Sequence, residues 1–127
     1  MASRILVLDD EKLIRWSLDK ILTQEGYEVD TSADLAEALK LADGPPYDLI
    51  ITDLEICGDQ ARLFFSAMAA KQPKGRVVIL TAMAKDLAER TLSGIATHAI
   101  IEKPFSSEEI RTVVKNAVGP MREPVLA

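Results

Sequence analysis

The sequence predicts an α/β domain in which helices cover both faces of a parallel β-sheet. Three short apolar runs, at residues 5–8, 49–51 and 77–80, are rich in branched side chains and do not alternate with polar residues. Such runs are typical of strands buried on both faces of a parallel sheet. Segments with helical periodicity lie between them. Alternating strands and helices favour a parallel sheet with helices on either side.

Two weaker strands bring the expected number to five, and they are Tyr27–Thr31 and Ala99–Ile101. The chain has 127 residues, and its composition is 48% hydrophobic. This fits one compact domain with a core that needs no disulfide. Cys57 is the only cysteine, so no intrachain disulfide can form.

Apolar residues at helical spacing predict a first helix around residues 13–22 and a second around 35–42. Ser32 is the expected N-cap of the second helix, and Gly44-Pro45-Pro46 ends it. A third helix is expected from an apolar stripe that precedes Pro73 and Gly75. Its members are Leu63, Phe64, Ala67, Met68 and Ala70.

A fourth helix is expected at residues 85–93, and Ser106 opens the fifth, with Glu109 three residues on as in a capping box. The fifth helix has the stripe Ile110, Val113, Val114, Ala117 and Val118. Residues 1–119 are therefore expected to form the domain. Residues 120–127 contain two prolines and no periodicity, and are expected to be a tail or the start of a linker.

The net charge of −5 and the absence of a run of Lys and Arg disfavour direct binding to nucleic acid. No stretch approaches the roughly 20 apolar residues that span a bilayer. We therefore expect a cytoplasmic protein.

Polar residues follow the predicted strands, at the edge where open parallel sheets bind ligands. They are Asp9-Asp10-Glu11, Asp53, Thr81 and Glu102-Lys103. Clustered carboxylates repel one another unless they share a proton or a cation, and Mg2+ prefers oxygen ligands. A carboxylate can also attack phosphorus, while a lysine and a hydroxyl stabilise the phosphoryl oxygens. The set suits Mg2+-assisted phosphoryl transfer to a carboxylate.

Four segments together resemble the receiver domain of two-component response regulators, over about residues 4–118. They are residues 5–11 (ILVLDDE), 48–54 (DLIITDL), 78–82 (VILTA) and 102–105 (EKPF). Residues 11–16 and 102–105 look most similar to receivers of the nitrogen-regulator type. The resemblance implies a flavodoxin-like receiver fold, with the five parallel strands in the order 2-1-3-4-5.

The resemblance also implies a role for each residue at this edge. Asp53 is the expected phosphoacceptor. Asp10 and Asp53 are expected to bind Mg2+ directly, Asp9 mainly through water, and Glu55 through its backbone carbonyl.

Thr81 and Lys103 are expected to contact the phosphoryl group, and an inward shift of Thr81 transmits the signal in this family. A cis peptide bond is expected before Pro104.

By the same resemblance, the phosphoryl group comes from a sensor histidine kinase or a phosphotransfer protein. Phosphorylation would alter the face formed by the fourth helix, fifth strand and fifth helix. That face would control a downstream protein or a missing effector domain, or pair with a second copy of the chain. Apart from its own phosphorylation and dephosphorylation, no enzymatic substrate is expected.

The sequence departs from the family pattern at two places. The loop at residues 55–60 has Cys57 in place of the usual proline and Gln60 in place of the usual glycine. Ile100 stands where the family usually has a switch aromatic, and its branched side chain is stiff. These departures leave open a degenerate receiver that binds partners without phosphorylation.

A phosphatase of the haloacid-dehalogenase type is a further alternative, disfavoured because its Asp-x-Asp motif is missing. Simpler interpretations also stand for several residues. Glu11 and His98 fit solvent-exposed positions, Cys57 fits a loop thiol, and Trp16 fits a packed or partly exposed helix position.

Overall fold

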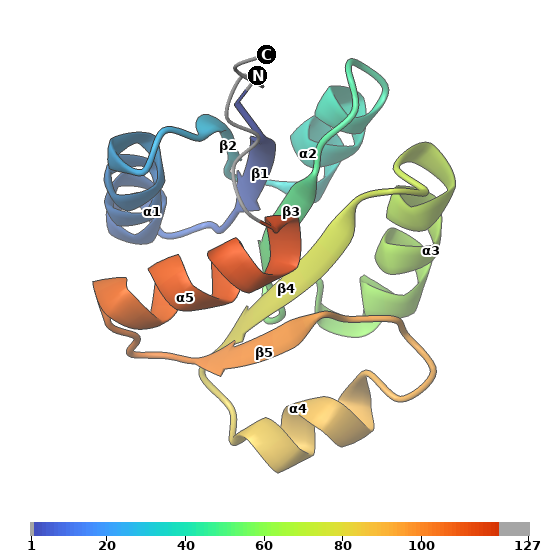
Figure 1. Ribbon diagram of the computed structural model, residues 1–127. Helices are drawn as coiled ribbons and strands as arrows, with labels where there is room; N and C mark the ends of the chain where they lie inside the picture. The colour runs from blue at the N-terminus through green and yellow to red at the C-terminus, as the bar shows by residue number, and fades with distance from the viewer. Residues whose placement is uncertain (1, 120–127) are drawn as a thin grey trace.

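The computed structural model describes residues 2–119, which form one five-stranded sheet with helices on both faces (Figure 1). The strand order is β2-β1-β3-β4-β5, and every pair is parallel. The strands are β1 (Arg4–Leu8), β2 (Glu28–Ser32), β3 (Leu49–Asp53), β4 (Arg76–Thr81) and β5 (Ala99–Glu102). The predicted fold class and strand order are confirmed.

The helices are α1 (Lys12–Gln24), α2 (Leu35–Ala42), α3 (Ala61–Lys71), α4 (Lys85–Thr91) and α5 (Ser107–Val118), and a short 3-10 helix, η1 (Gly58–Gln60), precedes α3. Alternate residues of the central strands face opposite sides, so two core clusters form. In one, Leu6 and Ile50 pack with residues of α2, α3 and α4. In the other, Ile5 and Ile51 pack with residues of α1 and α5.

The start of α2 corrects a prediction made from the sequence. Asp34, not Ser32, is its N-cap, and the Asp34 side chain accepts a hydrogen bond of 2.8 Å from the Glu37 backbone N–H. Ser32 is the last residue of β2, and its hydroxyl donates to the Asp34 carbonyl at 2.9 Å. Ser32 therefore stabilises the turn that leads into the helix through this hydrogen bond. For α5, Ser106 is the N-cap as predicted, and it accepts from the Glu109 N–H at 3.1 Å.

Two leucines within the apolar patterns that predicted helices lie in solvent. Leu63 on α3 is 73% exposed and Leu13 on α1 is 70% exposed. The buried face of α3 consists of Ala61, Phe64, Phe65 and Met68, so Phe64 and Met68 of the predicted stripe are buried while Leu63 is not. The fourth helix is also shorter than predicted and ends at Thr91.

No helix within residues 2–119 is long and apolar enough to cross a bilayer. The expected tail at 120–127 lies outside the described residues.

Candidate functional site

The carboxyl ends of β1, β3, β4 and β5 lie in register and bring the predicted polar residues to one edge. Thr81 is level with Glu102, and Asp53 is level with Leu80. Backbone hydrogen bonds extend the pairing past the strand ends, from Leu54 N–H to the Leu80 carbonyl at 2.8 Å and from Lys103 N–H to the Thr81 carbonyl at 2.7 Å. The backbone that carries the site is therefore fixed by the sheet itself.

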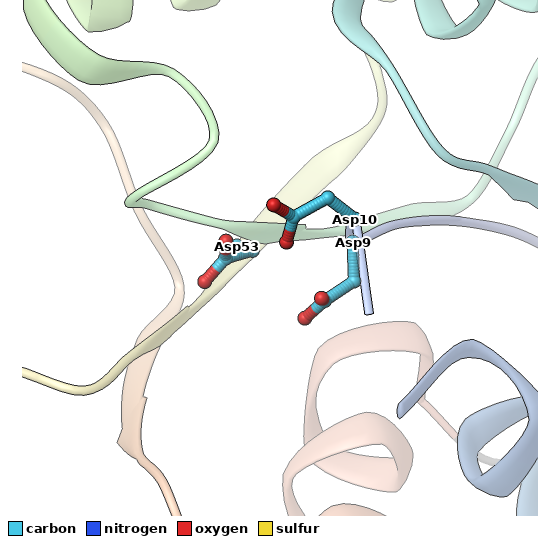
Figure 2. A group of neighbouring side chains, drawn as sticks. All are labelled: Asp9, Asp10 and Asp53. Carbon is cyan, nitrogen blue, oxygen red and sulfur yellow. The ribbon is translucent and has the colours of Figure 1, made fainter. Parts of the chain in front are cut away.

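Three carboxylates gather at this edge, as Figure 2 shows. Asp9 and Asp10 directly follow β1, and Asp53 is the last residue of β3. Each offers an oxygen within 4.8 Å of the oxygens of the other two. Asp9 is fully buried and Asp53 is 3% exposed, whereas Asp10 is open to solvent. The cluster is therefore buried at Asp9 and Asp53 and accessible to solvent at Asp10.

Lys103 brings one positive charge into the cluster. Its Nζ donates to Asp9 Oδ2 at 2.9 Å, and lies 3.2 Å from Asp53 Oδ1 and 3.5 Å from Glu11 Oε1. The peptide bond between Lys103 and Pro104 is cis, as predicted. Glu11 was expected to be a surface acid; its side chain is indeed exposed, yet it reaches the lysine.

The carboxylates of this cluster outnumber its one positive charge, that of Lys103. Burial raises the pKa of Asp53 above its ordinary value; the Lys103 charge lowers it, and the charges of Asp9 and Glu55 raise it further. Burial by itself lowers the pKa of Lys103, but its hydrogen bond to Asp9 and the charges of Asp53 and Asp9 outweigh burial, so the net pKa is raised. The raised pKa values of Asp53 and Lys103 are consistent with each other. Several carboxylates stabilise the charged form of Lys103, but its one positive charge cannot neutralise all of them.

Asp53 Oδ1 is the one buried side-chain oxygen or nitrogen of the described residues without a hydrogen-bond donor. Lys103 Nζ is close to it, but without the alignment of a hydrogen bond. The other carboxylate oxygen of Asp53, Oδ2, accepts a hydrogen bond from the Ile56 N–H at 3.2 Å. Clustered carboxylate oxygens and excess negative charge together fit a divalent cation such as Mg2+.

Thr81 is fully buried, and its hydroxyl is already engaged. Its Oγ1 donates to the Glu55 carboxylate, with Oγ1 3.0 and 3.1 Å from the two Glu55 oxygens, and accepts from the Met83 N–H at 3.1 Å. The Ala82 N–H also donates to Glu55 Oε1. The sequence pointed to the Glu55 backbone and missed both the Glu55 side chain and Ala82. Glu55 and Ala82 follow the neighbouring strands β3 and β4, and this was the sequence feature that could have indicated their contact.

The loop after Asp53 turns through η1, and Cys57 is buried in it. Its Sγ lies 3.7 Å from the Asp53 carbonyl oxygen, within the core cluster beneath the site. The expectation of a loop thiol therefore holds for the backbone, but the side chain belongs to the core.

Comparison with known proteins agrees with this geometry. Residues 5–115 match the family model of the response regulator receiver domain. The transcriptional regulatory protein PdtaR of Mycobacterium tuberculosis is 35% identical over 121 residues, which are 94% of this chain and 58% of PdtaR. This chain therefore spans little more than half the length of that relative. Sporulation initiation phosphotransferase F of Bacillus subtilis is 32% identical, with 91% of this chain and 93% of that protein covered.

Among solved structures, a CheY-like receiver domain protein from Methanospirillum hungatei superposes with a TM-score of 0.84 over 93% of this chain and 94% of its own. At 23% identity, that likeness shows the fold alone.

The DNA-binding transcriptional regulator NtrC of a Bradyrhizobium species is 27% identical over 98% of this chain and 26% of NtrC. Relatives of other types match at higher identity, so a nitrogen-regulator subgroup stays a prediction. The family itself is shown by the model match, which covers most of the sequence and all four strand ends that carry polar residues. The chain belongs to the response regulator receiver domain family.

Proposed function

We propose that this chain is a phosphorylation-dependent switch of a two-component phosphorelay and that Asp53 accepts the phosphoryl group. The observation that carries the proposal is the convergence of Asp9, Asp10 and Asp53 within 4.8 Å, with Lys103 Nζ 3.2 Å from Asp53 Oδ1. A nucleophile, a cation site and a fixed positive charge are the parts that phosphoryl transfer to a carboxylate requires.

In the proposed transfer, Asp53 Oδ1 attacks phosphorus, because this oxygen accepts no hydrogen bond from the described residues. The new O–P bond forms while the bond from phosphorus to the imidazole nitrogen of a phosphohistidine breaks. The electron pair of that bond stays on the departing imidazole. Attack by water on phosphorus later releases inorganic phosphate and restores the carboxylate.

The side chains around Asp53 have separate tasks in this scheme. Lys103 balances negative charge on the phosphoryl oxygens, and Thr81 donates its hydroxyl to one of them. Asp10 and Asp53 would hold Mg2+ directly. Both Asp9 oxygens already accept hydrogen bonds, from Glu11 N–H at 2.9 Å and from Lys103, which favours a role for Asp9 through water.

The Glu55 backbone carbonyl is proposed as the further ligand. Bound Mg2+ would supply charge neutralisation for the phosphoryl oxygens.

The partners follow from the same proposal. A sensor histidine kinase or phosphotransfer protein would donate the phosphoryl group to this chain in the cytoplasm. The face formed by α4, β5 and α5 would pass the change to a downstream protein, an effector domain or a second copy of the chain. Ile100 on β5 is partly buried against the core, so the coupling cannot depend on an aromatic ring that swings inward at this position.

The test is the intact mass of the protein after incubation with acetyl phosphate, with and without Mg2+. We expect a gain of one phosphoryl group that requires Mg2+ and is lost in Asp53→Ala. The matched control is Asp59→Ala, which removes the same charge from an exposed position in η1 and should be labelled like the wild type. Equal labelling of Asp53→Ala would show that the acceptor is a different residue.

A further inference from the structure

The Glu55 carboxylate lies between two loops that meet at the site. Glu55 follows β3, and the two donors that it contacts, the Thr81 hydroxyl and the Ala82 N–H, are at the end of β4 and just beyond it. Thr81 is buried, whereas Glu55 and Ala82 are exposed. The contact therefore ties the two loops together at a position that solvent and small anions can reach.

Each of the two donors has a single proton to give. The Thr81 hydroxyl donates its proton to Glu55, because a carboxylate can only accept, and the same hydroxyl oxygen accepts from the Met83 N–H. The Ala82 N–H is directed at the same carboxylate. An oxygen of a phosphoryl group on Asp53 can bond to these donors only after Glu55 has released them. Like-charge repulsion between Glu55 and the phosphoryl group acts in the same direction.

We infer that the Glu55 side chain is an internal competitor, which holds the Thr81 and Ala82 donors until a phosphoryl group displaces it. The inference rests on the proposed function and adds a positioning residue to it. A phosphoryl group brings up to about two negative charges and is fixed covalently at Asp53. A glutamate brings one charge on a side chain that loses rotamer freedom when it is held. The exchange therefore favours the phosphorylated state, but Glu55 reduces the gain.

Amide hydrogen exchange tests the contact without any phosphoryl donor or metal. The Ala82 N–H should exchange slowly in the wild type and faster in Glu55→Ala, because no other acceptor among the described residues takes its hydrogen. Asp59→Ala, which removes the same charge from the same loop region, should leave the exchange of Ala82 unchanged. Equal exchange in the wild type and Glu55→Ala would overturn the inference.

Titration with beryllofluoride, a mimic of the phosphoryl group, in the presence of Mg2+ tests the competition. NMR shifts of the site amides give the midpoint. We expect Glu55→Ala to lower the midpoint by at least about tenfold, because it frees two donors and each makes a charge-assisted hydrogen bond to Glu55. Glu55→Gln, which keeps an acceptor but loses the charge, should lie between this variant and the wild type. Asp59→Ala should match the wild type.

Two results of this titration would count against different claims. If the wild type binds beryllofluoride and Glu55→Ala binds it no better, the competitor role is wrong while the proposed function stands. If no protein binds, Glu55→Ala included, the proposed function is wrong and the competitor role falls with it.

Discussion

Asp53 combines a buried position, a neighbouring lysine and an oxygen without a hydrogen-bond donor. Its position could be predicted from the sequence because β3 is an apolar run that ends at this carboxylate. The Glu55 contact could not, because it depends on which rotamer a flexible side chain adopts between two loops. Sequence patterns can therefore predict the place of a residue that a strand holds in position, such as Asp53. They cannot predict the place of a side chain that is held by a contact between two loops, such as Glu55.

Asp53→Ala should stabilise the protein at pH 7 in the absence of divalent cations. The raised pKa of Asp53 means that its charged form opposes folding: stability is greatest below the unfolded pKa of 3.8 and is lost as pH rises through the folded value. Removal of this charge should raise the unfolding free energy by on the order of 1 kcal/mol. Urea denaturation measures it, with Asp59→Ala as the control for net charge.

Millimolar Mg2+ in the same experiment should raise the Tm of the wild type and leave that of Asp53→Ala nearly unchanged. An equal response of both proteins would place the cation elsewhere.

Cys57 should react slowly with thiol reagents in the folded protein. Burial raises the pKa of its thiol from 9.0 to about 11; the neighbouring Asp53 and Glu55 charges add to the increase, and Thr52 opposes it. The raised pKa favours the neutral thiol, so little thiolate exists at pH 8. The stability that the buried neutral thiol contributes is lost as the pH rises from 9.0 through about 11. Reaction with a chromogenic disulfide should be about a hundredfold slower than in urea. Comparable rates would mean that the loop opens readily.

The helix starts show how a local pattern can mislead. Ser32 has the chemistry of an N-cap, but β2 extends through it, so Asp34 is the residue in position to cap α2. Leu63 likewise has the chemistry of a core residue, but Ala61, Phe64, Phe65 and Met68 form the buried face of α3, and Leu63 lies outside it. The end of β2 decided the first outcome, and element ends are hard to fix from sequence to within a few residues. The direction of the buried helix face decided the second.

The N-cap of α5 provides a matched pair of serines. Ser106→Ala should lower the unfolding free energy by about 1 kcal/mol, because the Glu109 N–H then loses its acceptor. Ser107→Ala should have a much smaller effect, since Ser107 is exposed and its recorded side-chain contact is a long one of 3.4 Å with Arg111. Chemical denaturation of the two variants measures the difference. Equal losses would show that the cap contributes little to α5.

At the scale of the whole molecule, the sheet order follows from which strands are buried on both faces. Most residues of the central strands β1, β3 and β4 are buried, while β2 at the edge has an exposed or partly exposed residue at four of its five positions. Alternation of strands and helices predicted the class of fold, but the order 2-1-3-4-5 came from resemblance to a family. Both agree with the structure, which gathers groups far apart in sequence: Lys103 and Asp9 meet across 94 residues.

The most direct test of the central claim is to locate the acyl phosphate in the sequence. The protein is phosphorylated with acetyl phosphate and Mg2+, reduced with borohydride to convert the acyl phosphate to an alcohol, and digested with trypsin. The peptide from Leu41 to Arg62 contains four aspartates, at positions 43, 48, 53 and 59, which fragment masses distinguish. We predict homoserine at position 53 alone. Homoserine at another position, or a phosphorylated protein without it at 53, would contradict the account.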